Sequence, residues 1–232
     1  MTDTTTNTTT SGIPAQGTPP LADTSDMAQV HRVFREAIAN APALIGSATS
    51  HGSERVELVA SYYRNVLALL HAHHDGEDEL IWPILIQRAP DQAAEVQRIA
   101  GQHGDVGTSL EAAVDAVLEW RNASDAVSGS TAAAAIASLG AALLAHLDEE
   151  EAFIVPLAAK HIYAPEWGEL PGHALRNFSG DKMWLVLGLV REQMRPEQLA
   201  MMDEHMPPPV VAMWQQHETQ YNKFVAELRA TP

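Results

Sequence analysis

Two segments of the chain, residues 70–83 and 143–156, repeat one pattern at a fixed offset of 73 positions. Each segment places a histidine four residues before a glutamate, and a proline six residues after that glutamate. The pairs are His73 with Glu77 and His146 with Glu150. Residues four apart in an α-helix lie on one face, one turn apart, so both members of a pair can reach one metal ion. Two copies of such a pair indicate a metal site far more strongly than one copy would.

Apolar residues recur at every third or fourth position around both segments, which predicts that each is part of an amphipathic helix. Two further stretches have the same period, and their apolar stripes include His31 and His103. Four amphipathic helices with short connections predict an all-α fold, an up-down-up-down four-helix bundle. Residues 161–232 predict a C-terminal helical extension that packs against the bundle or against a partner.

Turn-forming residues and prolines predict where the helices begin, kink and end. The second helix is expected to begin at Ser53 and to kink at Pro83, because proline lacks a backbone donor and clashes with the carbonyl four residues back. A turn at residues 89–91 is expected before the third helix. Residues 121–130 predict a loop, so the fourth helix is expected to begin near residue 130.

The lengths of these helices place the polar residues of the stripes at a similar level. With a rise of about 1.5 Å per residue, His73 lies roughly 22 Å before the turn at Pro90, and His103 lies roughly 18–20 Å after it. By the same rise, His103 lies about 26 Å before the next loop and His146 about 24 Å after it. His31 fits less well, because it is nearer to its loop than His73 is.

Four imidazoles and two carboxylates at one level suit two adjacent divalent cations, with the carboxylates bridging and each histidine bound to one cation. The predicted metal site consists of His31, His73, Glu77, His103, His146 and Glu150. These ligands leave coordination positions open for oxygen, peroxide, hydroxide or another small ligand. A purely structural role for the histidines is the alternative, but it would leave two buried glutamates without a partner, at a high cost.

Composition narrows the chemistry further. The chain has no cysteine, so disulfides, thiolate ligands and iron–sulfur clusters are excluded, and the available ligands suit iron, manganese or zinc. A net charge of −16 argues against a nucleic-acid partner.

Residues 1–24, rich in Thr, Gly and Pro, predict a disordered tail without the features of a signal peptide. No run of eighteen apolar residues occurs, so we expect no membrane span and a cytoplasmic protein.

The remaining histidines are expected outside the site. His74 lies one residue off the stripe, and a surface or flank position is favoured over a role as a spare ligand or in orienting one. Asp78 and Glu151 are expected to face solvent or to orient ligand histidines. The histidines interpreted as non-ligands are His51, His71, His161, His173, His205 and His217.

Other known metal and phosphate motifs do not match the chain. A ferritin-like di-iron site requires a glutamate three residues before a histidine, and no histidine here has one. The His-Glu-x-x-His pattern of zinc proteases is absent, as are glycine-rich phosphate-binding motifs.

The segments DMAQVHRVFR, HHDGEDELIWP, QHGDVG and HLDEEEAFIVP together resemble the hemerythrin / HHE cation-binding family, over about residues 26–160. The resemblance implies a four-helix bundle with a non-haem centre of two iron ions. It places His31, His73, His103 and His146 on the family's histidine ligands. It also places Glu77 and Glu150 on the bridging carboxylates.

One position departs from this pattern. Oxygen-carrying members have a second histidine one turn after the ligand of the third helix, where this chain has Gly107. One iron would then lose a ligand, or gain water or another side chain. The departure weakens the case for reversible oxygen carriage and favours chemistry at an open position.

The sequence thus predicts three parts: a disordered tail at 1–24, a hemerythrin-like domain at 25–160 and the helical extension at 161–232. The leading hypothesis is a non-haem di-iron protein that binds O2, peroxide or nitric oxide. Two alternatives stay open, a peroxide-decomposing enzyme and a sensor of iron or oxygen that acts through the extension. A small diatomic molecule or peroxide is the expected partner, and the sequence does not identify a protein partner.

Overall fold

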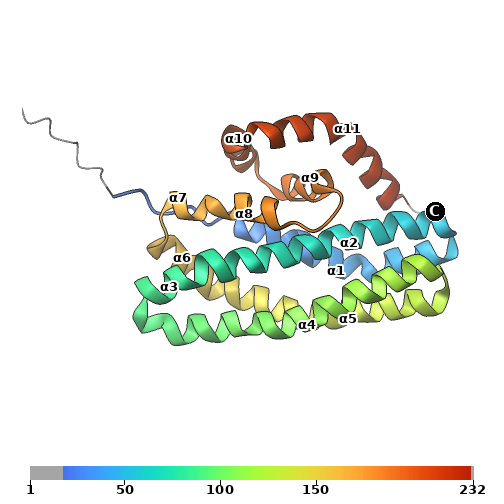
Figure 1. The fold of residues 1–232 in the computed structure, drawn as a ribbon, viewed down its shortest axis with the longest axis horizontal. Coiled ribbons are helices and arrows are strands. Elements are labelled where there is room, and N and C mark those ends of the chain that lie inside the picture. Colours follow the sequence, from blue (N-terminus) through green and yellow to red (C-terminus); the bar gives the residue numbers. More distant parts are fainter. Residues whose placement is uncertain (1–17, 231–232) are drawn as a thin grey trace, which may run out of the picture.

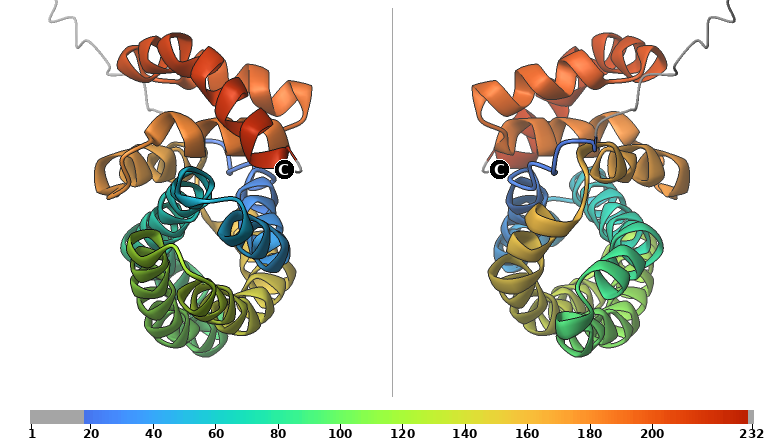
Figure 2. Two further views of the ribbon diagram at one scale, coloured as in Figure 1. Left: turned by 90° about the vertical axis from the view of Figure 1, so that its right-hand side faces the viewer. Right: turned by 90° about the vertical axis from the view of Figure 1, so that its left-hand side faces the viewer.

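The computed structural model describes residues 18–230, and the part of the chain it describes is all-α, as predicted. Four long helices pack in the cyclic order α1, α2, α4, α5, with α5 returning to α1. They are α1 (Met27–Ser50), α2 (Ser53–Gly76), α4 (Ala93–Ala123) and α5 (Ala126–Glu149). Consecutive long helices run in opposite directions (Figure 1), and an end-on view shows them as a ring around a common interior (Figure 2).

Two of the four helices continue through a π-helical turn that precedes a proline. α2 leads into η1 (Glu77–Ile81) and α3 (Trp82–Arg88), while α5 leads into η3 (Glu150–Ile154) and α6 (Val155–His161). Because proline cannot donate to the carbonyl four residues back, the helix widens by one residue before it. The Trp82 N–H then bonds to the carbonyl of Glu77, five residues back, and Val155 bonds likewise to Glu150. The disruption expected at Pro83 is therefore a π-turn, and it occurs in both copies of the repeat.

The predicted loop at 121–130 is wrong, because the connection between α4 and α5 consists of two residues. Ser124 adopts a left-handed backbone with φ of 53°, which reverses the chain. The carboxylate of Asp125 then accepts a hydrogen bond from the Ser128 N–H at 2.8 Å and caps α5. Ser128, Gly129 and Ser130, which also suggested a loop, lie inside the first turns of α5, where Ser128 and Gly129 are buried. A 3₁₀ turn, η2 (Pro90–Gln92), makes the connection between α3 and α4.

The continuous helix Ala126–His161 is long and apolar enough to cross a membrane by length and composition, with a mean hydropathy of 1.6. Composition alone therefore does not exclude a membrane-spanning helix at this position. In the fold described here, Ile136, Leu139 and Leu143 of this helix are buried in the shared core. Packing against the neighbouring helices accounts for the apolar character of these side chains.

The described part of the C-terminal extension, up to residue 230, forms five helices and packs against the bundle. They are α7 (Ala164–Trp167), α8 (Glu169–Asn177), α9 (Met183–Gln193), α10 (Pro196–His205) and α11 (Pro208–Arg229). α9 contacts α1 and α2, and α11 packs on α9 (Figure 1). Buried side chains such as Leu185 and Val225 join the hydrophobic core of the bundle. Of the two options that the sequence left open, the structure shows packing against the bundle.

The end of the predicted N-terminal tail lies against the chain after α6. The Ala22 N–H donates to the carbonyl of Ile162 at 2.9 Å, and the Ala164 N–H donates to the carbonyl of Pro20 at 2.8 Å. Ala22 and Thr24 are buried. Residues 1–17, which make up most of the predicted tail, lie outside the described residues.

Candidate metal centre

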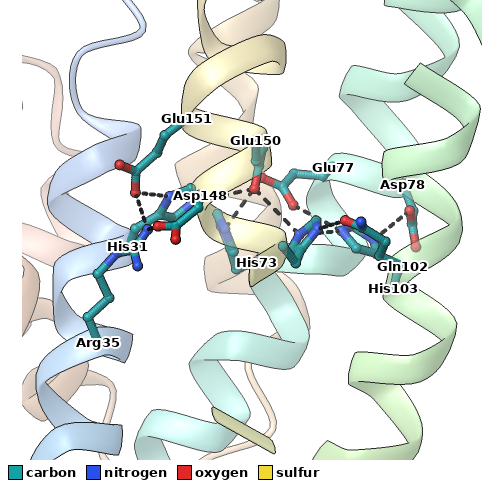
Figure 3. A network of polar contacts seen from close by, with 11 residues as sticks. His31, Arg35, His73, Glu77, Asp78, Gln102, His103, Asp148, Glu150 and Glu151 are labelled. Atoms are coloured by element: carbon teal, nitrogen blue, oxygen red, sulfur yellow. Dashed lines mark hydrogen bonds and ion pairs between the residues drawn. The ribbon is translucent and has the colours of Figure 1, made fainter. Parts of the chain in front are cut away.

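All six residues of the predicted site come together inside the bundle, and Figure 3 labels each of them except His146. α1 contributes His31, α2 contributes His73, α4 contributes His103 and α5 contributes His146. Glu77 and Glu150 are the first residues of the two π-turns. The prolines thus fix the start of the wider helical turn at the residue that carries each carboxylate.

The potential ligands form two clusters of four residues that share Glu77. In each cluster, the potential ligand atoms lie within 4.8 Å of one another. The first cluster consists of His31, His73, Glu77 and Glu150. The second cluster consists of His74, Glu77, His103 and His146.

The distances within the two clusters show how the carboxylates are shared. Glu77 lies between them, with Oε1 3.4 Å from His73 Nε2 and Oε2 3.6 Å from His103 Nε2. Glu150 Oε2 lies 3.5 Å from Nε2 of His31 and also 3.5 Å from Nε2 of His146. The carboxylates are therefore placed to contact both positions, as bridging ligands must be.

His74 faces the interior of the bundle, contrary to the surface or flank position predicted from the sequence. Its side chain is buried, with 6% of the residue exposed, and its imidazole stacks on that of His103 with ring centroids 4.1 Å apart. At Gly107, where the chain departs from the pattern of oxygen-carrying members, an added Cβ would meet nothing within 4 Å. Two signals in the sequence could have identified His74. α4 has Gly107 instead of a second histidine, and α2 has two adjacent histidines, His73 and His74.

Seven buried atoms of the two clusters lack a hydrogen-bond partner among the described residues. They are Nε2 of His31, His73 and His74, and both carboxylate oxygens of Glu77 and of Glu150. Buried polar atoms are nearly always paired, because an unpaired one costs about 1–3 kcal/mol. Converging lone pairs without donors are the arrangement that a bound cation satisfies. The residues present therefore fit a metal centre.

The outer nitrogens of three ligand histidines have polar partners, which fix the orientation of each ring. His31 Nδ1 lies 2.9 Å from Glu151 Oε1, and His103 Nδ1 lies 2.9 Å from Asp78 Oδ1. His146 Nδ1 lies 3.0 Å from Gln102 Oε1. When Nδ1 carries the proton and donates it outward, the lone pair of Nε2 points into the centre. Of the two expectations for Asp78 and Glu151, these contacts support the orienting role.

Burial sets the protonation of the centre in the absence of a cation. It lowers the pKa of His73 and His74 well below the usual range, and that of His146 to about 3. These histidines are therefore neutral near pH 7, the form that binds metals. Burial, together with the nearby Glu150, raises the pKa of Glu77 well above its usual range. A bound cation would instead lower the pKa of Glu77, because a nearby positive charge favours the ionised carboxylate.

Comparison with known proteins agrees with this geometry. A family model described as the hemerythrin HHE cation binding domain matches residues 22–158, more than half of the chain. No curated protein and no solved structure matches the chain.

Proposed function

Since the chain belongs to the hemerythrin HHE cation-binding family, we propose that its centre holds two iron ions and binds O2, peroxide or nitric oxide. The observation that carries this proposal is the set of seven buried, unpartnered ligand atoms, which divide between two positions. We also interpret the ring of α1, α2, α4 and α5 as the up-down-up-down bundle expected of the family.

The two positions receive unequal sets of donors. Three imidazoles, from His74, His103 and His146, face the second cluster, whereas His31 and His73 are the imidazoles of the first. With both carboxylates shared, the first position has the smaller number of donors. An external ligand would therefore bind the iron held by His31 and His73.

A small apolar cavity next to the first cluster supports a small ligand. Its volume is about 10 Å³, and its lining contains only apolar side chains and the ring of Tyr63, whose hydroxyl donates to the carbonyl of Ala37. α1, α2 and α5 line the cavity, and Phe34 in the lining also packs on the ring of His73, with centroids 5.4 Å apart. A space of this size is at the lower limit for one water-sized molecule, and its apolar lining disfavours a larger polar substrate.

Bound iron would supply one-electron redox chemistry toward the small ligand. The protein supplies the surroundings: neutral imidazoles, two shared carboxylates and a dry interior. Burial in this interior strengthens the interaction of an anionic ligand with the centre. Glu151 and Asp78 hold the rings of His31 and His103 in a fixed orientation.

An anaerobic iron titration tests the proposal. We expect two Fe²⁺ per chain, and on addition of O2 or peroxide a charge-transfer absorption from an oxygen ligand to iron. His74→Ala should bind about one iron per chain, because the second position loses one of three imidazoles. His71→Ala is the matched control, because His71 is exposed and pairs with Asp75 outside the centre. Saturation at one iron or fewer per parental chain would contradict the proposal of two iron ions.

Hydrogen peroxide separates binding from turnover at the same centre. Repeated evolution of O2 by the iron-loaded protein, absent in His73→Ala, would identify the peroxide-decomposing alternative. A single spectral change without O2 evolution would identify a binding protein.

A further inference from the structure

α8 of the C-terminal extension lies along α2 and η1, next to the backbone that carries Glu77 (Figure 1). Leu170 and His173 of α8 cover Gly76, the residue directly before Glu77. A Cβ at position 76 would lie 3.2 Å from Leu170 Cδ2 and 3.3 Å from His173 Nδ1, closer than ordinary van der Waals contact. Glycine at this position therefore allows α8 to approach the backbone that carries Glu77.

A polar contact joins α8 to the π-turn itself. His173 is buried, with 4% of the residue exposed, and its Nε2 lies 2.9 Å from Oε2 of Glu79, inside η1. One turn later on α8, the side-chain amide of Asn177 donates to the carbonyl of His173 at 3.2 Å. The turn that begins with Glu77 is thus held from outside the bundle.

Contacts on both sides of α8 attach it to the bundle. Before it, the indole N–H of Trp167 donates to Asp26 Oδ1 at 3.0 Å. After it, the buried side chain of Asn65 on α2 donates to Asp181 Oδ1 at 2.9 Å and accepts a hydrogen bond from the Lys182 N–H at 2.8 Å. α8 is therefore a fixed support for η1.

The repeat in the sequence shows that this support serves one half of the centre. At the offset of 73 residues, Gly76 corresponds to Glu149 and Glu79 corresponds to Ala152. The second π-turn has neither the glycine nor the carboxylate that α8 uses. The contact is specific to the turn that carries Glu77, the carboxylate shared by both clusters.

We propose that His173 is a positioning residue for the metal centre, acting through Glu79 to hold η1 and with it the carboxylate of Glu77. This inference rests on the proposed metal binding. Because coupling between two sites is reciprocal, metal binding must also hold α8 more firmly in place.

Binding of Co²⁺ to the full chain tests the first half of this proposal, since the absorption spectrum of Co²⁺ reports coordination geometry. His173→Gln, Gly76→Ala and Glu79→Ala should each weaken Co²⁺ binding about tenfold, the low end of the effect of residues that orient ligands. Each should also change the spectrum. Glu79→Gln keeps an acceptor for His173 and should restore most of the affinity.

Two controls separate positioning from general damage. Gly101→Ala on α4 adds a methyl group that meets nothing within 4 Å, and His205→Gln changes an exposed histidine of the extension. Both should match the parental protein in affinity and spectrum. If Gly76→Ala does not fold, the result is decided by His173→Gln and by the comparison of Glu79→Ala with Glu79→Gln. Parental affinity and spectrum in His173→Gln would overturn the inference, whereas a parental chain that binds no Co²⁺ would overturn the proposed function and the inference with it.

Trypsin cleavage after Arg176 tests the reciprocal effect. Co²⁺ should slow this cleavage in the parental protein, because metal binding fixes η1 and thereby α8. In His173→Gln the cleavage rate should no longer depend on Co²⁺. Equal protection of both proteins by Co²⁺ would contradict the coupling.

Discussion

The imidazole of His74 stacks on that of His103, with ring centroids 4.1 Å apart and an interplanar angle of 17°. This pairing brings a third histidine to the second cluster from α2, although α4 has Gly107 one turn after His103. A histidine at position 107 and the histidine at position 74 would therefore serve the same metal position from different helices.

A rescue experiment follows from this relationship. We expect His74→Ala to reduce bound iron to about one ion per chain, and His74→Ala with Gly107→His to restore the second ion. The backbone at position 107 accepts a side chain there, because a Cβ meets nothing within 4 Å. Iron content after anaerobic loading measures both effects.

The control for this rescue is His74→Ala with Gly104→His. Position 104 is exposed and also has free space for a Cβ. Because it directly follows His103, its side chain points to a different face of the helix from that of His103. Equal iron content in the two double variants would show that the added histidine acts without regard to position.

A second prediction concerns the contact between His31 and Glu151. The hydrogen bond with His31, followed by that with Arg35, lowers the pKa of Glu151, so the carboxylate is ionised and orients the imidazole. Glu151→Gln removes the charge at nearly constant size, and we expect metal affinity to fall about tenfold. Competition with a chelator of known affinity measures the change. Asp148→Asn should have little effect, because Asp148 is largely exposed and contacts Arg35 rather than a histidine.

A third prediction concerns the stability of the metal-free protein at low pH. In the unfolded chain the histidines titrate near pH 6.5, whereas burial lowers the pKa of His73, His74 and His146 in the folded protein. Below pH 6.5 the unfolded chain therefore binds protons that the folded protein does not bind, and stability falls. The contribution of His146, whose pKa falls to about 3, reaches up to about 5 kcal/mol.

Glu77 acts in the opposite direction. Its raised pKa means that the folded protein keeps a proton which the unfolded chain loses above about pH 4.5, so this group reduces stability as the pH rises. The three histidines outweigh it below pH 6.5, and we expect maximal stability close to that pH. Urea unfolding between pH 4 and 8 measures the profile. Glu77→Gln should remove the decline above pH 6.5, and a parental profile that is flat down to pH 4 would contradict the account.

Much of the centre could be predicted from the chain because helical periodicity converts spacing into direction. His73 and Glu77, four residues apart, face one way whatever surrounds them, and the same holds for His146 and Glu150. Similar helix lengths on the two sides of the turn at Pro90 then bring His103 to the level of these pairs, whereas His31 is predicted from its apolar stripe and fits the lengths less well. Each of these inferences depends on local geometry within a few turns of helix.

The loop predicted at 121–130 shows where local patterns mislead. Serine and glycine there occupy the first turns of α5, because Asp125 supplies the cap and the following residues pack against other helices. Tertiary packing outweighed the weak preference of these residues for loops.

Sequence alone therefore determined the class of fold, the two His–Glu pairs and the disruption of the helix at Pro83, since these follow from backbone geometry and side-chain period. Tertiary structure decided the rest. Whether His74 faces the interior depends on how wide a face the neighbouring helices cover, and whether α8 supports η1 depends on contacts between residues nearly a hundred positions apart. Such contacts are set by the packing of helices against one another, which no periodicity within a single helix specifies.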